Sequence, residues 1–153
     1  MQANEKTIET LNDLIKINND RIEGYQRAIN EAKDLDIDLK ATFERMISES
    51  AQYKQELMAL AQQHGGDVDV DDTTTSGKIY RAWMDVKATF TGHDRKAILE
   101  SCEFGEEAAQ RAYESVMSIG EELLPEANTL ITTQQKALKS SHDLIKKYRD
   151  SHK

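Results

Sequence analysis

The sequence predicts an all-α fold, a bundle of four long helices joined by two short connections and one long one. Only 7 glycines and 1 proline interrupt the 153 residues, which leaves room for long helices. Aromatic residues make up 6% of the chain, fewer than an all-β fold would need. Apolar residues also recur at steps of three and four over four stretches, the spacing of one helix face. We expect residues 1–153 to form one domain.

Each of the four stretches carries one apolar stripe. The first two stripes consist of Ile8, Leu11, Ile15, Ile22, Tyr25, Ile29 and Ala32, and of Leu39, Phe43, Met46, Tyr53, Leu57 and Leu60. The third and fourth consist of Ile98, Cys102, Ala109, Ala112, Val116 and Ile119, and of Ala127, Ile131, Leu138, Ile145 and Tyr148. Because a single stripe cannot be buried alone, the four helices must pack together as a bundle.

Two connections are short and make their helices antiparallel neighbours. Residues 34–38, with three aspartates that can serve as N-caps, predict a turn between the first two helices. Between the last two helices, Gly120 can end one helix and Pro125 can begin the next in its first turn.

The middle connection is long, from about Gln63 to Asp94, and Asp94 can cap the third helix. It contains a short amphipathic segment, residues 79–87, which predicts a short helix. A connection of this length can cross the whole bundle and make the second and third helices parallel, as in ferritin-like folds with one long crossover. The alternative is an up-down-up-down bundle with an unstructured excursion, which leaves Trp83 without a packing role.

The charge balance restricts the function. The chain has 20 basic and 28 acidic side chains and a net charge of −8, which repels nucleic-acid phosphates and anionic membrane surfaces. No stretch approaches the ~20 apolar residues that a membrane span requires. The first residues lack the apolar run of a signal peptide, and the single cysteine, Cys102, cannot form an internal disulfide. We therefore expect a cytoplasmic protein.

The acidic loop after the second helix is similar to a calcium loop only in part. Asp67, Asp69 and Asp71 occupy alternating positions. A calcium loop then requires Gly at position 6 and a bidentate Glu at position 12, where this chain has Asp72 and Lys78. A lysine in the place of the closing carboxylate repels the ion, so we interpret the segment as a solvated loop.

Each apolar stripe has a gap near its middle, filled by Asn18, Ser50, Gly105 and Ser141 respectively. Counting from the turns puts these residues at similar heights, so one layer of the core should be small, polar and uncharged. The interpretation we favour is a hydrogen-bonded layer that fixes the register of the helices. The alternative is a cavity that binds a small ligand.

A di-metal centre in such a bundle requires inward carboxylates and two Glu-x-x-His pairs. No Glu-x-x-His occurs in the sequence. The metal-ligand candidates, for iron or manganese, are Glu49, Glu106 and His142, which lie beside the polar layer. Because so incomplete a set more often forms salt bridges, we predict no resident cofactor. Cys102 is expected to be a buried, small apolar residue rather than a nucleophile.

Three segments and one further residue carry a family resemblance: residues 11–15, 80–84 and 102–106, with Tyr113. They look like a bacterial family of ferritin-like proteins catalogued as a domain of unknown function. The resemblance covers nearly the whole chain. It implies a four-helix ferritin-like fold with a crossover and brings no established activity.

The chain departs from bacterioferritins at the positions of their metal ligands. In those proteins a liganding Glu precedes a Tyr by seven residues. Here Tyr25 keeps this spacing, but Asn18 stands in the place of the Glu. Their Glu-x-x-His in the last helix resembles Lys139 and His142 here, with lysine in the place of the carboxylate. These departures argue against iron oxidation.

The leading hypothesis is a non-enzymatic ferritin-like bundle that associates with itself or with a protein partner. The family resemblance also implies a stress-related role. Tyr80, Trp83 and Phe90 of the crossover could cover the bundle or meet that partner. The first rival is an iron- or manganese-dependent oxidoreductase or metal store that uses the three candidate ligands. The second rival is a small-ligand binder at the polar layer.

Overall fold

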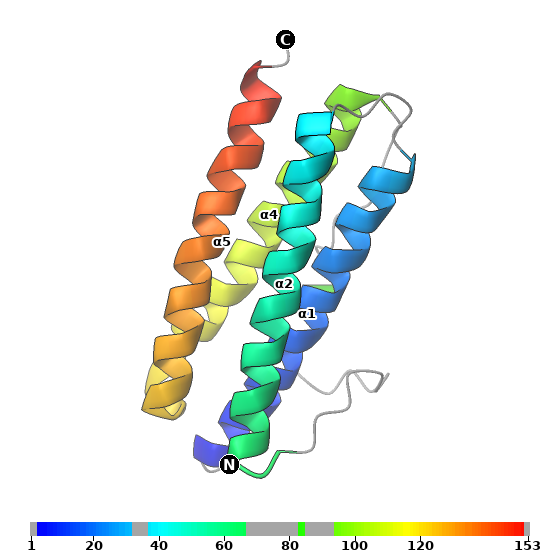
Figure 1. Ribbon diagram of the computed structural model, residues 1–153. Coiled ribbons are helices and arrows are strands. Elements are labelled where there is room, and N and C mark those ends of the chain that lie inside the picture. The colour runs from blue at the N-terminus through cyan, green and yellow to red at the C-terminus, as the bar shows by residue number, and fades with distance from the viewer. Residues whose placement is uncertain (1–2, 32–36, 67–82, 85–93, 152–153) are drawn as a thin grey trace.

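The computed structural model describes residues 3–31, 37–66, 83–84 and 94–151 (Figure 1). The helices in this part of the chain are α1 (Ala3–Glu31), α2 (Ile37–Gln63), α4 (Arg95–Met117), the short 3-10 helix η1 (Gly120–Glu122) and α5 (Pro125–Ser151). The described residues contain four long helices and no strand. The prediction of an all-α bundle is therefore confirmed.

Two apolar clusters, one toward each end of the bundle, define the helix directions. One cluster joins the end of α1 and of α5 to the start of α2 and of α4: Tyr25, Ala28, Leu39, Phe43, Met46, Ile98, Leu99 and Ile145. The other joins the start of α1 and of α5 to the end of α2 and of α4, and includes Leu11, Leu14, Leu57, Ala61, Val116 and Ala127. The helices α2 and α4 therefore run parallel to each other and antiparallel to α1 and α5 (Figure 1).

Neighbouring helices pack as α1 on α2, α4 on α5, α1 on α4 and α2 on α5. The end of α2 and the start of α4, which the long connection joins, therefore lie at opposite ends of the bundle. Of this connection the structure describes the end of α2 and Trp83 and Met84, both helical. The rest of the predicted short helix, 79–87, and the acidic loop lie outside the described residues, as do residues 34–36 of the first turn.

The ends of α4 and α5 agree in part with the sequence signals. The backbone N–H of Ala97 donates to Asp94 Oδ1 at 2.8 Å, so Asp94 is the N-cap of α4, and Pro125 is the first residue of α5. The role predicted for Gly120 was wrong. Helix α4 ends at Met117, and Gly120 begins η1 instead, where its carbonyl accepts a 2.6 Å hydrogen bond from Asn128 Nδ2.

Helix α2 ends in a Schellman motif built on two glycines. Gly65 has φ 81°, in the left-handed region that glycine adopts without strain. The N–H of Gly66 donates to the carbonyl of Ala61 at 2.8 Å, and that of Gly65 to Gln62 at 3.0 Å. A Cβ on Gly66 would lie 2.9 Å from Ile8 Cγ2, so this glycine also permits close packing on α1.

The buried face of α1 is rotated slightly from the predicted stripe. Ile8, Ile22 and Ile29 are only half-buried. The fully buried apolar residues of this helix include Leu14, Ile17 and Ala28, which the predicted stripe omitted. No helix in the described part of the chain combines the length and apolarity needed to cross a bilayer.

Candidate functional site

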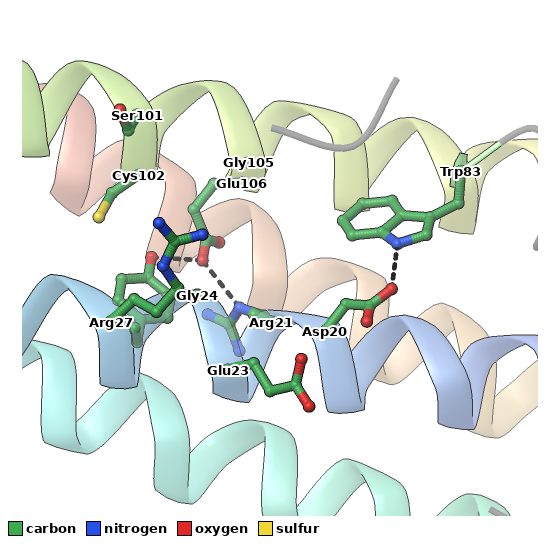
Figure 2. Close-up of a pocket in the computed structure, with 11 residues that line it drawn as sticks. Asp20, Arg21, Glu23, Gly24, Arg27, Trp83, Ser101, Cys102, Gly105 and Glu106 are labelled. Atoms are coloured by element: carbon green, nitrogen blue, oxygen red, sulfur yellow. Dashed lines mark hydrogen bonds and ion pairs between the residues drawn. The ribbon is translucent and has the colours of Figure 1, made fainter. Parts of the chain in front are cut away.

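The centre of the bundle is occupied by an arginine. Arg21 lies on the inner face of α1, three residues after Asn18 and four before Tyr25, and its side chain is 4% exposed. Its Nε donates to Glu106 Oε1 of α4 at 2.7 Å (Figure 2). Its Nη2 lies 3.3 Å from Glu49 Oε1 of α2. One guanidinium thus ties three helices together.

The Nη1 atom and the face of the guanidinium also make contacts. Nη1 donates to Ser50 Oγ at 2.8 Å and to the carbonyl of Met46 at 3.3 Å. The ring of Tyr25 lies 5.5 Å from the guanidinium carbon, within the range of a cation–π contact. Burial alone would lower the pKa of Arg21, but the combined effects of Glu106, Tyr25 and Glu49 outweigh burial and raise it, so the guanidinium stays protonated.

Glu106 is the most buried carboxylate of this centre, with 1% of its side chain exposed. Its Oε1 accepts both from Arg21 and from the hydroxyl of Tyr25, the latter at 2.5 Å. Burial and the charge of Glu106 raise the pKa of Tyr25 well above its usual value, so its hydroxyl remains a donor. One carboxylate oxygen thus joins the hydroxyl of Tyr25 to the guanidinium of Arg21.

A chain of hydrogen bonds extends the centre to α5. Asn18 Oδ1 accepts from Ser50 Oγ at 2.9 Å, and Asn18 Nδ2 donates to the hydroxyl of Tyr113 at 2.9 Å. Tyr113 donates to Gln134 Oε1 at 2.7 Å, and Ser141 Oγ donates to a carboxylate oxygen of Glu49 at 2.8 Å. The prediction of a hydrogen-bonded polar layer is therefore confirmed. The prediction that the layer is uncharged was wrong, because it contains an ion pair.

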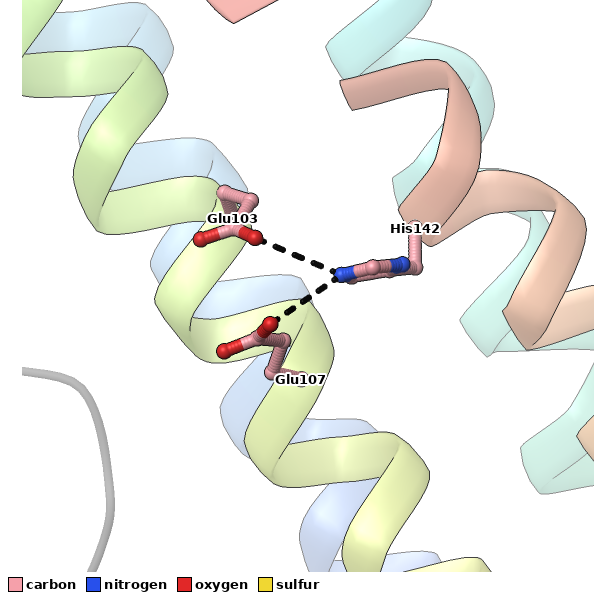
Figure 3. Close-up of side chains that lie close together, drawn as sticks. All are labelled: Glu103, Glu107 and His142. Carbon is pink, nitrogen blue, oxygen red and sulfur yellow. Dashed lines mark ion pairs between the residues drawn. The ribbon is translucent and has the colours of Figure 1, made fainter. Parts of the chain in front are cut away.

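The structure separates the three predicted metal-ligand candidates. Glu49 and Glu106 come together, but on the guanidinium of Arg21. His142 instead faces two other carboxylates of α4, with its Nε2 3.4 Å from Glu103 Oε1 and 3.6 Å from Glu107 Oε1 (Figure 3).

A cavity of about 140 Å³ adjoins the centre between α1 and α4. Arg21 and Glu106 form part of its lining, as does Gly105 of the predicted layer. Trp83 forms another wall, and its indole N–H donates to Asp20 Oδ2 at 2.7 Å (Figure 2). Trp83 is 4% exposed and belongs to the apolar cluster that includes Leu11 and Val116, so it packs against the bundle.

Cys102 also lines this cavity and has intermediate exposure. Burial and the charge of Glu106 raise the pKa of its thiol. A thiol that resists ionisation is a poor nucleophile. The prediction of a buried side chain was wrong, because Cys102 is partly exposed.

Arg21 and Gln134 are central residues that were not predicted from the sequence. The spacing of each one along its helix indicates an inward position. Arg21 continues the inner series of Asn18 and Tyr25 at steps of three and four, and Gln134 stands between Ile131 and Leu138 in the same way. Polar side chains at such steps are inward-facing candidates, whatever their charge.

The fold and the site define an all-α bundle whose centre is closed by a buried arginine–carboxylate network. The chain belongs to the family described as a domain of unknown function, DUF2383, whose model matches residues 6–118. The match includes most of α1 and all of α2 and α4, while α5 lies beyond it. No curated protein matches the chain. The match agrees with the resemblance to a family of unknown function and names no activity.

Proposed function

We propose that this protein is a ferritin-like bundle that works by association, and not by metal redox chemistry at its centre. The helix directions support the first part, since parallel α2 and α4 joined by a bundle-length connection are typical of ferritin-like folds. The stress-related role implied by the family resemblance stays a prediction.

The buried arginine carries the second part of the proposal. Ferritin-like di-metal centres place carboxylates from all four helices around two cations. Here a permanent cation, the guanidinium of Arg21, already takes the carboxylates of Glu49 and Glu106. A metal ion at this position would have to displace Arg21 or lie beside its charge. Iron or manganese catalysis with Glu49, Glu106 and His142 is therefore the less favoured function.

Exposed apolar side chains support association. Phe104 of α4 is 51% exposed and Met84 is 47% exposed. Each is the chain neighbour of a residue that lines the α1–α4 cavity, Gly105 and Trp83 respectively. Large apolar side chains exposed on the surface are a suitable contact for a second protein surface. We take a second copy of this chain as the partner to be tested.

Light scattering after size-exclusion chromatography tests this proposal. We expect the wild type to form a dimer or larger species, and Phe104→Ser to shift it toward the monomer. Met117→Ser is the matched control, because Met117 is a 38% exposed residue at the far end of the same helix. A wild type that stays monomeric at all concentrations would contradict self-association.

The cavity favours a second candidate function, the binding of a small ligand beside the polar layer. Its volume of about 140 Å³ suits a small molecule, and its lining combines Trp83 with the charged groups of Arg21 and Glu106. A ligand at 100 times its Kd would stabilise the fold by about 2.7 kcal/mol, which a thermal-shift screen detects.

A cavity-filling variant checks the location of any ligand found in this way. Gly24 lines the cavity, and a Cβ built on it meets no atom of the described residues within 4 Å. Gly24→Leu should therefore fold and remove the ligand's stabilising effect. If the stabilisation persisted unchanged in this variant, the ligand would bind elsewhere and this candidate would fail.

A further inference from the structure

Three potential metal ligands converge on the flank between α4 and α5 (Figure 3). Glu103 and Glu107 are one helical turn apart on α4, so their side chains share a face. His142 of α5 points between them, and one ligand atom from each of the three residues lies within 4.8 Å of the others. We propose that this cluster is a binding site for one divalent transition-metal cation, separate from the Arg21 centre.

The distances suit such an ion. Ligands about 2.1 Å from a tetrahedral cation lie roughly 3.4 Å from each other. The Nε2 of His142 is 3.4 Å from Glu103 Oε1 and 3.6 Å from Glu107 Oε1. The side chain of Glu107 is 41% exposed, so it can adjust its position and leaves a route for the ion from solvent.

The imidazole is oriented as a ligand. Nδ1 of His142 lies 3.2 Å from Asp143 Oδ1, and we assign the ring proton to this nitrogen. Lys139 Nζ is 3.2 Å from the other carboxylate oxygen of Asp143, so Lys139 and His142 together hold this carboxylate in place. Nε2 then presents its lone pair to the two glutamates. A histidine that donates its second nitrogen to a carboxylate is typical of metal sites.

The contacts of His142 Nε2 with the two glutamates are the observation that supports a bound cation. This atom is buried and has no hydrogen-bond partner of good geometry among the described residues, and the side chain of His142 is 12% exposed. With the ring proton on Nδ1, the Nε2 lone pair and the two carboxylate oxygens repel one another unless a proton or a metal cation lies between them. Arg149 pairs with the other oxygen of Glu103, at 3.2 Å, and leaves Oε1 to face the imidazole.

One imidazole nitrogen and two carboxylate oxygens, without a thiolate, suit zinc(II), manganese(II), iron(II) or cobalt(II). Water would complete the coordination on the solvent side. Zinc(II) is the probe of choice for affinity because it has no redox chemistry, and cobalt(II) reports the coordination through its visible spectrum.

Calorimetric titration of the chelator-treated full chain with zinc(II) tests the proposal. We expect one equivalent to bind, and His142→Gln and Glu107→Gln each to weaken binding at least ~10-fold. Asp143→Ala should weaken it by ~10- to 100-fold through loss of the orienting hydrogen bond. His64→Gln is the control, because His64 Nε2 lies 3.4 Å from a single carboxylate, that of Glu126, and its loss should leave the affinity unchanged.

Circular dichroism verifies that each variant is folded, and cobalt(II) gives a second readout. The cobalt(II) spectrum should change in Glu107→Gln and stay the same in His64→Gln. The absence of stoichiometric binding, or binding and spectra that are equal in the wild type and His142→Gln, would overturn the proposal. His142 would then serve as a contact of the two glutamates that ties α5 to α4. Neither result depends on the oligomeric state, so this proposal and the proposed function can fail separately.

Discussion

Arg21 of α1 and Glu106 of α4 are 85 positions apart in the sequence and meet through a 2.7 Å ion pair at the centre of the bundle. Both side chains are almost completely buried, at 4% and 1% exposure. A buried pair of this kind requires both partners, because either one alone is an uncompensated charge in a medium of low dielectric constant. The pair therefore fixes the position of α1 relative to α4.

Removal of one partner should be strongly destabilising. We expect Glu106→Ala to lower the free energy of unfolding by about 3–5 kcal/mol, because it removes the 2.7 Å partner of Arg21 and leaves the buried guanidinium beside Glu49 at 3.3 Å. Urea denaturation measures the change. Replacing both partners, as Arg21→Met with Glu106→Leu, should cost less than the sum of the single changes. Strict additivity in this double-mutant cycle would show that the two residues do not interact.

The hydroxyl of Tyr113 should contribute through its two hydrogen bonds. Tyr113→Phe removes the donor to Gln134 Oε1 and one acceptor of Asn18 Nδ2, both buried. Leaving such groups unsatisfied costs about 1–3 kcal/mol in chemical denaturation. Tyr148→Phe is the control, since Tyr148 is only half-buried and its hydroxyl makes one 3.3 Å contact, with Thr42. Equal effects of the two changes would argue against a special role for the central hydroxyl.

Alkaline conditions should destabilise the fold. Burial and the nearby Glu49 raise the pKa of Tyr53 from 10.0 to about 12. The unfolded chain therefore loses this proton at a lower pH than the folded chain does. The stability contributed by the neutral phenol is complete below pH 10 and is lost as the pH rises toward 12. Burial raises the pKa of Tyr25 and Tyr113 as well, with the same sign.

Denaturation midpoints on both sides of pH 10, with tyrosinate absorbance as the second readout, check this expectation. Tyr53→Phe should flatten the pH dependence above that point. A midpoint that is constant through this range, or rises, would contradict the direction of the pKa shift.

Cys102 should react slowly in the folded protein. Its raised thiol pKa leaves little thiolate near neutral pH, and thiolate is the reactive form. We expect the alkylation rate to increase when urea unfolds the chain. A simple thiol compound at the same pH gives the reference rate. Reaction in the native state as fast as the reference would indicate an accessible, ionised cysteine.

An all-α bundle of four helices could be predicted from the sequence because helix signals are local. The periodic apolar stripes predicted four helices, and two boundaries, at Asp94 and Pro125, agree with the structure. The levels assigned to Asn18 and Ser50 also agree, since their side chains share a 2.9 Å hydrogen bond. These predictions needed only helix geometry and the position of a short connection.

The candidate site was predicted less completely because it depends on contacts between distant helices. In a chain with 31% charged residues, an arginine in a helix is normally expected on the solvent side. The inward position of Arg21 becomes evident only when Glu49 and Glu106 are placed opposite it. The contact of His142 with Glu103 and Glu107 likewise depends on how α4 and α5 are rotated about their own axes. The sequence alone does not determine this rotation.

The most direct test of the closed centre is iron(II) or manganese(II) loading of the His142→Gln variant, followed by metal analysis after gel filtration. This variant removes the proposed flank site, so any remaining stoichiometric metal would report the centre. We predict that no equivalent is retained, because Arg21 holds the carboxylates of Glu49 and Glu106. Retention of two equivalents that are lost in the further variant Glu49→Gln would contradict the account.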